Sequence, residues 1–93
     1  MAVTITLPGV LQELADGRAS LTLEGAPATV AEAMATLHTT WPALYTRIMT
    51  EKREVRPHVN LFVGDREIRR TGGLETPLGE GTEILVLPAV SGG

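Results

Sequence analysis

Two stretches near the N-terminus alternate between apolar and polar side chains. Residues 3–7 follow this period of two and are rich in β-branched types, and residues 19–23 repeat the pattern. Such alternation is typical of strands that bury one face. Pro8-Gly9 ends the first stretch and Asp16-Gly17 supplies a turn before the second, so the two are predicted to form a loose hairpin.

The hydrophobic period becomes helical after Pro27. Thr29 and Glu32 have the spacing of a capping box, in which each side chain accepts a hydrogen bond from the other's backbone N–H. Pro42 suits the first turn of a helix, so a second, shorter helix is predicted from there to residue 49. The apolar residues at helical spacing are Val30, Ala33, Met34, Leu37 and Trp41 in the first helix, and Leu44, Tyr45, Ile48 and Met49 in the second.

The C-terminal half returns to a period of two. Residues 50–57 are charged and are predicted to form an exposed loop before a strand at 59–63. Gly64-Asp65 indicates a turn, after which residues 67–69 are predicted to return as a short strand. Residues 82–87 are apolar on both faces, which places this last strand at the centre of the sheet. In the strand at 59–63, Val59, Leu61 and Val63 share one face, and His58, Asn60 and Phe62 share the other.

This order of elements predicts an α+β fold. A helix that follows a hairpin must cross the sheet to bury both apolar faces, and the first and last strands then become parallel neighbours at its centre. We predict a single β-grasp, or ubiquitin-like, domain over residues 1–88. It would have a mixed sheet of four to five strands, with one main helix and a second short helix packed on one face. Residues 89–93 are predicted to be a flexible tail.

Composition narrows the class of protein. A chain of 93 residues with 43% hydrophobic and 20% charged residues can bury one core. No apolar run reaches the length of a membrane span, and the N-terminus lacks the basic region of a signal peptide. The sequence contains no cysteine, which excludes disulfides and thiolate chemistry on this chain. We therefore expect a soluble, cytoplasmic domain with no membrane partner.

Charge is divided along the chain. Residues 47–70 carry a net charge of +3, whereas residues 1–46 and 71–93 each carry −3. The basic segment is either a solvated surface of mixed sign or a face that steers a partner of opposite charge. Three aromatic residues and a net charge of −3 argue against nucleic acid, whose single strands are bound by aromatic platforms in basic grooves.

A search for an internal active site finds no catalytic pattern. His38 and His58 are the only histidines, and the chain has no metal-binding motif, no nucleophile elbow and no phosphate loop with its lysine. Gly72-Gly73 is interpreted as a backbone turn. We expect no intrinsic catalytic residue, no bound metal and no cofactor, and interpret the protein as a domain on which partner enzymes act.

The end of the sequence is the candidate for chemistry. After Pro88 the chain runs Ala89-Val90-Ser91-Gly92-Gly93, with no bulk in its last two residues. Such a tail can enter a narrow channel and present its carboxylate, or it can be an inert terminus. A carboxylate is a poor electrophile and reacts only after conversion to a form such as an acyl-adenylate. A partner would have to supply the ATP and magnesium for that step.

Residues 58–93 resemble the ubiquitin-like sulfur carriers of the MoaD, ThiS and CysO type, with the strongest likeness to CysO. The resemblance rests on Val59-Asn60-Leu61-Phe62-Val63-Gly64-Asp65, Ile68-Arg69, Gly72-Gly73-Leu74, Glu80-Gly81 and the final Leu87-Pro88-Ala89-Val90-Ser91-Gly92-Gly93. One departure is Gly64, which stands where an asparagine is common at the turn. The first half matches mainly in the order and length of its elements.

The resemblance implies roles for particular residues. Gly93 would be adenylated and converted to a thiocarboxylate, while Gly92, Ser91 and Val90 would lie in the partner's active site. Phe62, Leu87 and Pro88 would dock on the partner, although periodicity alone leaves Phe62 equally suited to the core.

The partners implied are a ubiquitin-activating-type adenylyltransferase similar to MoeB or ThiF, an acceptor enzyme similar to a cysteine synthase, and a processing metalloprotease. Cysteine is the favoured product, with molybdopterin, the thiamin thiazole and a specialised metabolite as alternatives.

Two other functions remain open from the sequence. One is a ubiquitin-like modifier that is joined to lysines through Gly93, for which Lys52 would be the only internal linkage site between copies. The other is a β-grasp interaction module with an inert tail.

Overall fold

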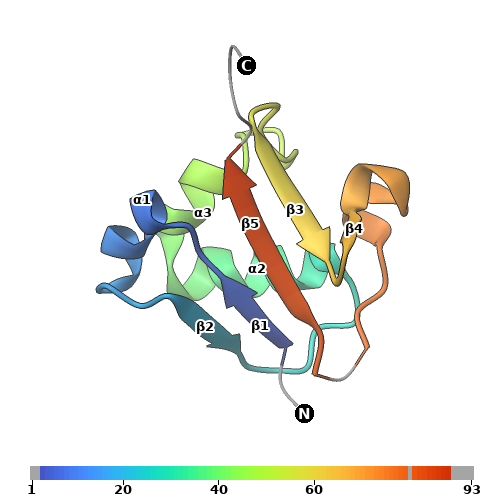
Figure 1. The fold of residues 1–93 in the computed structure, drawn as a ribbon, viewed down its shortest axis with the longest axis horizontal. Coiled ribbons are helices and arrows are strands. Elements are labelled where there is room, and N and C mark those ends of the chain that lie inside the picture. Colours follow the sequence, from blue (N-terminus) through green and yellow to red (C-terminus); the bar gives the residue numbers. More distant parts are fainter. Residues whose placement is uncertain (1–2, 80, 89–93) are drawn as a thin grey trace.

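A five-stranded sheet with helices on one face forms the protein in the computed structural model, which describes residues 3–79 and 81–88 (Figure 1). The strands are β1 (Val3–Thr6), β2 (Ser20–Leu23), β3 (Val59–Val63), β4 (Arg66–Glu67) and β5 (Glu83–Pro88). The α-helices are α1 (Gly9–Gln12), α2 (Val30–Thr40) and α3 (Pro42–Ile48), and the 3₁₀ segments are η1 (Glu13–Ala15), η2 (Ile68–Arg70) and η3 (Gly73–Glu75).

Strand β5 lies at the centre of the sheet, whose order is β2-β1-β5-β3-β4. It runs parallel to β1, with Ile84 opposite Ile5, and antiparallel to β3, with Val86 opposite Leu61. Strands β1 and β2 form an antiparallel hairpin. This topology confirms the predicted β-grasp fold, including the parallel pairing of the first and last strands.

Helices α2 and α3 cover one face of the sheet, and Figure 1 views the sheet from its other, outer face. Alternation along each strand turns one set of apolar side chains toward these helices. Ile5, Leu61 and Ile84 are fully buried there, as are Leu37 of α2 and Leu44 of α3. The core is therefore a layer between sheet and helices, as expected for an element that must bury one apolar face.

Helix α2 begins at its predicted cap. Thr29 Oγ1 accepts a hydrogen bond of 3.2 Å from the backbone N–H of Glu32. The Glu32 side chain accepts from the backbone N–H of Ala28 at 3.0 Å, one residue before the donor that a full capping box would use. The helix ends at Thr40, and Pro42 opens α3 at its first position.

The predicted return strand at 67–69 is wrong in its bounds and partly in its type. Pairing with β3 stops at Glu67, and residues Ile68–Arg70 form the 3₁₀ segment η2. The chain leaves the sheet because Ile68 turns into the core, where it is 1% exposed. At the turn before β4, Gly64 has a φ of 64°, a left-handed conformation that glycine and asparagine both adopt easily.

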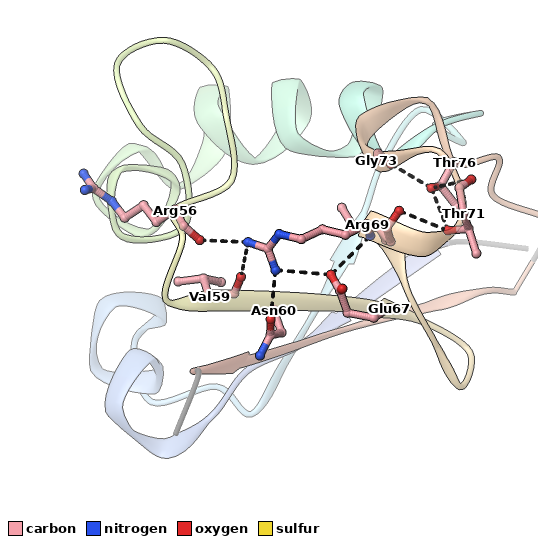
Figure 2. Close-up of polar contacts among 9 residues, drawn as sticks. Arg56, Val59, Asn60, Glu67, Arg69, Thr71, Gly73 and Thr76 are labelled. Carbon is pink, nitrogen blue, oxygen red and sulfur yellow. Dashed lines mark hydrogen bonds and ion pairs between the residues drawn. The ribbon is translucent and has the colours of Figure 1, made fainter. Parts of the chain in front are cut away.

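A turn at Gly72-Gly73 is confirmed. Both glycines have positive φ, 111° and 62°, and η3 begins there. The buried Thr76 closes this turn, because its Oγ1 donates to the carbonyl oxygen of Gly73 at 2.7 Å and lies 3.0 Å from Oγ1 of Thr71 (Figure 2). These glycines therefore serve the backbone geometry of a turn.

Candidate functional site

The candidate tail is rooted in the central strand. Pro88 is the last residue of β5 and lies opposite Val59 at the start of β3. Val90, Ser91, Gly92 and Gly93 lie outside the described residues, so their predicted roles remain predictions. From Pro88, the five residues that follow can span at most about 17 Å. A site that acts on Gly93 must therefore approach this end of the sheet closely.

An apolar patch lies on the outer face of the sheet, where Phe62 and Leu85 are directly opposite each other in the β3–β5 pair. Leu87 follows two residues later on the same face and is 38% exposed. Phe62 is half-buried and points away from the helices, so it is not part of the main core. Leu85 extends the patch but was not among the predicted docking residues. The alternation along the strand could have identified it, because residues 85 and 87 share one face.

Polar residues surround this patch on the outer face. On the side of β1, the hydroxyl of Thr6 donates a hydrogen bond to the Glu83 carboxylate. On the side of β4, Arg69 Nη1 donates to Asn60 Oδ1 at 2.8 Å and lies 3.3 Å from Glu67 Oε2 (Figure 2). The apolar residues Phe62, Leu85 and Leu87 thus lie between two polar borders. An apolar centre with a polar border is the usual anatomy of a protein interface.

Arg69 also fixes the loop that leads into β3. Its Nη2 donates to the carbonyl oxygens of Arg56, at 3.1 Å, and Val59, at 2.9 Å (Figure 2). One guanidinium group therefore joins η2, the start of β3 and the residue before Pro57. Because a guanidinium presents its donors in a rigid plane, this contact set fixes the relative positions of those backbone segments.

A groove of about 490 Å³ opens at the same end of the sheet but on its helix side. Pro88 and Val86 of β5 line it together with Val59, Leu11 and Val10. Leu87 and Pro88, both predicted to dock on the partner, therefore point to opposite sides of the sheet. The remaining lining residues are Pro8, Thr46, Arg47, Arg56 and His58.

His58 does not join Asn60 and Phe62 on the outer face, contrary to the predicted alternation. It lies in the turn before β3, where the period of two does not yet apply, and lines the groove. His38 stacks on Tyr45 with ring centroids 4.2 Å apart. The two histidines are thus on different elements and have separate surroundings.

The described residues contain neither a metal site nor a membrane-spanning helix. Over 3–79 and 81–88, no three His, Asp or Glu side chains gather in a way that could hold a metal ion. In the same part of the chain, no helix has the length and apolar character needed to cross a membrane. The outer patch, through Leu87, and the groove, through Pro88, both reach the end of β5.

Comparison with known proteins gives the family. A model of the ThiS family matches residues 5–93. The chain belongs to the ThiS family. The match extends to the last glycine, so Gly92-Gly93 falls within the part of the chain that the ThiS family describes.

Sulfur carrier proteins resemble the chain over its whole length. The sulfur carrier protein CysO of Mycobacterium tuberculosis (strain H37Rv) is 30% identical over 95 residues, covering 100% of both chains. The crystal structure of the Amycolatopsis orientalis BexX/CysO complex contains a chain that matches with a TM-score of 0.86 and 32% identity, over 99% of this chain and 100% of that one. These matches confirm the resemblance to the CysO type within the ThiS family.

A third relative has a different name. Small archaeal modifier protein 3 of Haloferax volcanii is 36% identical over 66 residues, or 71% of each chain. The chain is thus similar both to proteins named as sulfur carriers and to a protein named as a modifier.

Proposed function

We propose that this protein is a sulfur carrier whose C-terminal Gly93 carboxylate is adenylated and then converted to a thiocarboxylate. The observation that carries the proposal is the Gly92-Gly93 pair, which follows the central strand of a chain that belongs to the ThiS family and matches CysO over its full length. The protein would be a co-substrate of its partner enzymes, acting in the cytoplasm.

Activation would take place on a ubiquitin-activating-type adenylyltransferase, similar to MoeB or ThiF. A carboxylate oxygen of Gly93 attacks the α-phosphorus of ATP, pyrophosphate leaves, and an acyl-adenylate forms. Magnesium held by the partner would neutralise charge on the phosphates. The absence of side chains at positions 92 and 93 supports this step, because a β-carbon would hinder the approach of the carboxylate through a narrow channel.

Sulfur would then replace AMP. A hydrosulfide sulfur attacks the acyl carbon, AMP leaves, a proton is released, and Gly93 carries a thiocarboxylate. This anion is a better nucleophile than a carboxylate and can attack an electrophilic substrate in an acceptor enzyme. The similarity to CysO favours an activated serine as the acceptor and cysteine as the product; a molybdopterin precursor, the thiamin thiazole and a specialised metabolite are alternatives.

Docking of the activating partner would use the outer patch of Phe62, Leu85 and Leu87. Two of its residues, Leu85 and Leu87, lie on β5, the strand that carries the tail, and Phe62 of β3 lies opposite Leu85. Aromatic residues are often found at energetic hot spots of interfaces. The structure of a BexX/CysO complex supports the idea that chains of this fold act together with partner proteins.

A second candidate is a protein modifier that forms an isopeptide bond between Gly93 and lysines of targets. The similarity to small archaeal modifier protein 3 favours it. The same adenylate would serve both functions, and the attacking group would be a lysine amine in place of sulfide. Lys52, the only lysine of the chain, lies exposed between Thr50 and Glu54 and would be the internal acceptor for self-conjugation.

The test combines ATP–pyrophosphate exchange with mass spectrometry. The full chain and a variant that lacks Gly92 and Gly93 are each mixed with the adenylyltransferase of the same organism. Exchange with the full chain and none with the variant, at equal thermal stability, is the expected result. Protein isolated from the native host should then show the mass gained when sulfur replaces one oxygen. Undiminished exchange by the shortened variant would reject the proposal, and isopeptide adducts without any thiocarboxylate would favour the modifier.

A further inference from the structure

The groove on the helix side differs in chemistry from the outer patch. The buried Val59 and Val86 form its apolar floor, and Leu11 and Pro88 also line it. Val10, at its edge, is 74% exposed and is one of the two large hydrophobic side chains that stand exposed among the described residues. Val10 extends the apolar lining of the groove into one continuous apolar surface, and such surfaces are typical of binding grooves.

The rim of the groove is basic. Arg47, Arg56 and His58 line it, and none of its described lining residues carries a carboxylate. Both guanidinium groups belong to the segment of net charge +3, in a chain whose total charge is −3. Two of the seven Lys and Arg residues of that segment, Arg47 and Arg56, thus lie at the end of the sheet where the tail begins, and Glu51 and Glu54 line a separate hollow on the other side of Arg56. This position favours a steering role over an evenly solvated surface.

Arg56 is held in place at this rim. Its Nε donates to the carbonyl oxygen of Thr46 at 2.9 Å, and its backbone N–H donates to the carbonyl oxygen of Ile48 at 3.0 Å. Its own carbonyl oxygen accepts from Arg69, and Figure 2 shows its side chain extending away from that residue. Since Nε makes the internal contact, the two terminal nitrogens keep the geometry required for bidentate binding of a carboxylate.

We propose that this groove binds an acidic segment of the adenylating partner, in which an apolar side chain fills the floor and neighbouring carboxylates pair with Arg47 and Arg56. The segment would lie at the mouth of the channel that receives the tail. Pro88 lines the groove and Gly93 lies at most about 17 Å further on, so that mouth must come close to the groove whenever Gly93 reaches the reacting phosphate. The domain is then held from both sides of β5.

This inference rests on the proposed function and is tested with the same adenylyltransferase. Exchange rates are measured against the concentration of the full chain for the wild type, Arg47→Glu and Val10→Ser. Both variants change exposed side chains, so their folding is checked by thermal melting. We expect Arg47→Glu to raise KM for the carrier about five- to tenfold with kcat unchanged, and to reduce the dependence of kcat/KM on salt. Val10→Ser should raise KM alone, with no change in salt dependence.

Arg18→Glu is the matched control, since it makes the same change of charge at an exposed residue outside the groove and the outer patch. If the wild-type chain supports exchange and both Arg47→Glu and Val10→Ser have the same KM as the wild type, the groove does not bind the partner. The proposed function would then remain intact. No exchange by the wild-type chain would reject both. A change in the molar mass of the free protein on Arg47→Glu would assign the groove to a second copy of the chain and overturn the proposal.

Discussion

Arg69 Nη1 donates a hydrogen bond of 2.8 Å to Asn60 Oδ1, so a side chain of η2 holds the residue that lies opposite Leu87 on the outer face. The same guanidinium binds Glu67 and two backbone carbonyl oxygens. The side chain of Arg69 is 42% exposed, yet it connects β3, η2 and the loop before β3. An exposed residue, Arg69, thus fixes one border of the outer patch.

Replacement of Arg69 by alanine should lower the free energy of unfolding by about 1–3 kcal/mol, because the carbonyl oxygens of Arg56 and Val59 lose a charged donor. Urea denaturation measures the change. Arg70→Ala is the control, since Arg70 is an exposed neighbour and should shift stability by less than about 0.5 kcal/mol. Equal effects of the two variants would show that the Arg69 contacts contribute nothing specific.

Phe62→Ala should weaken partner binding by about 2 kcal/mol and lower folding stability by only about 1 kcal/mol, because Phe62 is half-buried on the outer face. Leu61→Ala, one residue earlier and fully buried, should cost about 2–5 kcal/mol of folding stability. A thermal melt and a binding titration on both variants separate the two roles. Equal losses of folding stability in Phe62→Ala and Leu61→Ala would show that Phe62 is a core residue.

Thr29→Ala should reduce folding stability by about 1 kcal/mol, because the N–H of Glu32 loses its acceptor at the start of α2. Thr39→Ala provides the comparison within the same helix. The Thr39 hydroxyl bonds to the carbonyl oxygen of Ala35 in an exposed turn, and alanine has the higher helix propensity there. That variant should therefore be neutral or slightly stabilising in guanidinium titrations.

Gly92→Val tests the steric demand on the tail that the proposed function implies. A β-branched side chain should lower the rate of adenylate formation about tenfold or more, because it displaces the carboxylate in a narrow channel. The unfolding free energy should not change. Ser91→Ala, a smaller change one residue earlier, should keep most of the rate. Equal rates for Gly92→Val and the wild-type chain in pyrophosphate exchange would contradict the idea of a narrow channel.

Most of the fold could be predicted because each element carries its own local signal. The two apolar faces of β5 placed it at the centre, and the spacing of Thr29 and Glu32 marked the start of α2. The return strand was predicted less well. The pattern of polar and apolar residues at 67–69 is compatible both with a strand and with the 3₁₀ segment in which Ile68 is buried. Burial by the rest of the molecule decided between the two.

The site divides in the same way. Phe62 could be placed on the face opposite Val59 and Leu61 by alternation, and the structure agrees. The groove could not be predicted, because Leu11, Arg47, Arg56 and Pro88 are far apart in sequence and meet only when α1, α3 and β5 pack together. The hydrophobic pattern of the sequence does not show which distant segments pack together.

The central position of β5 has a mechanical consequence. A pull on the tail acts along the axis of this strand and must slide it past β1 and β3 at the same time. Hydrogen bonds between strands lie across that direction, so both ladders are loaded in shear and share the force. If the tail enters the active sites of partner enzymes as proposed, this arrangement would let the sheet resist the force of its withdrawal.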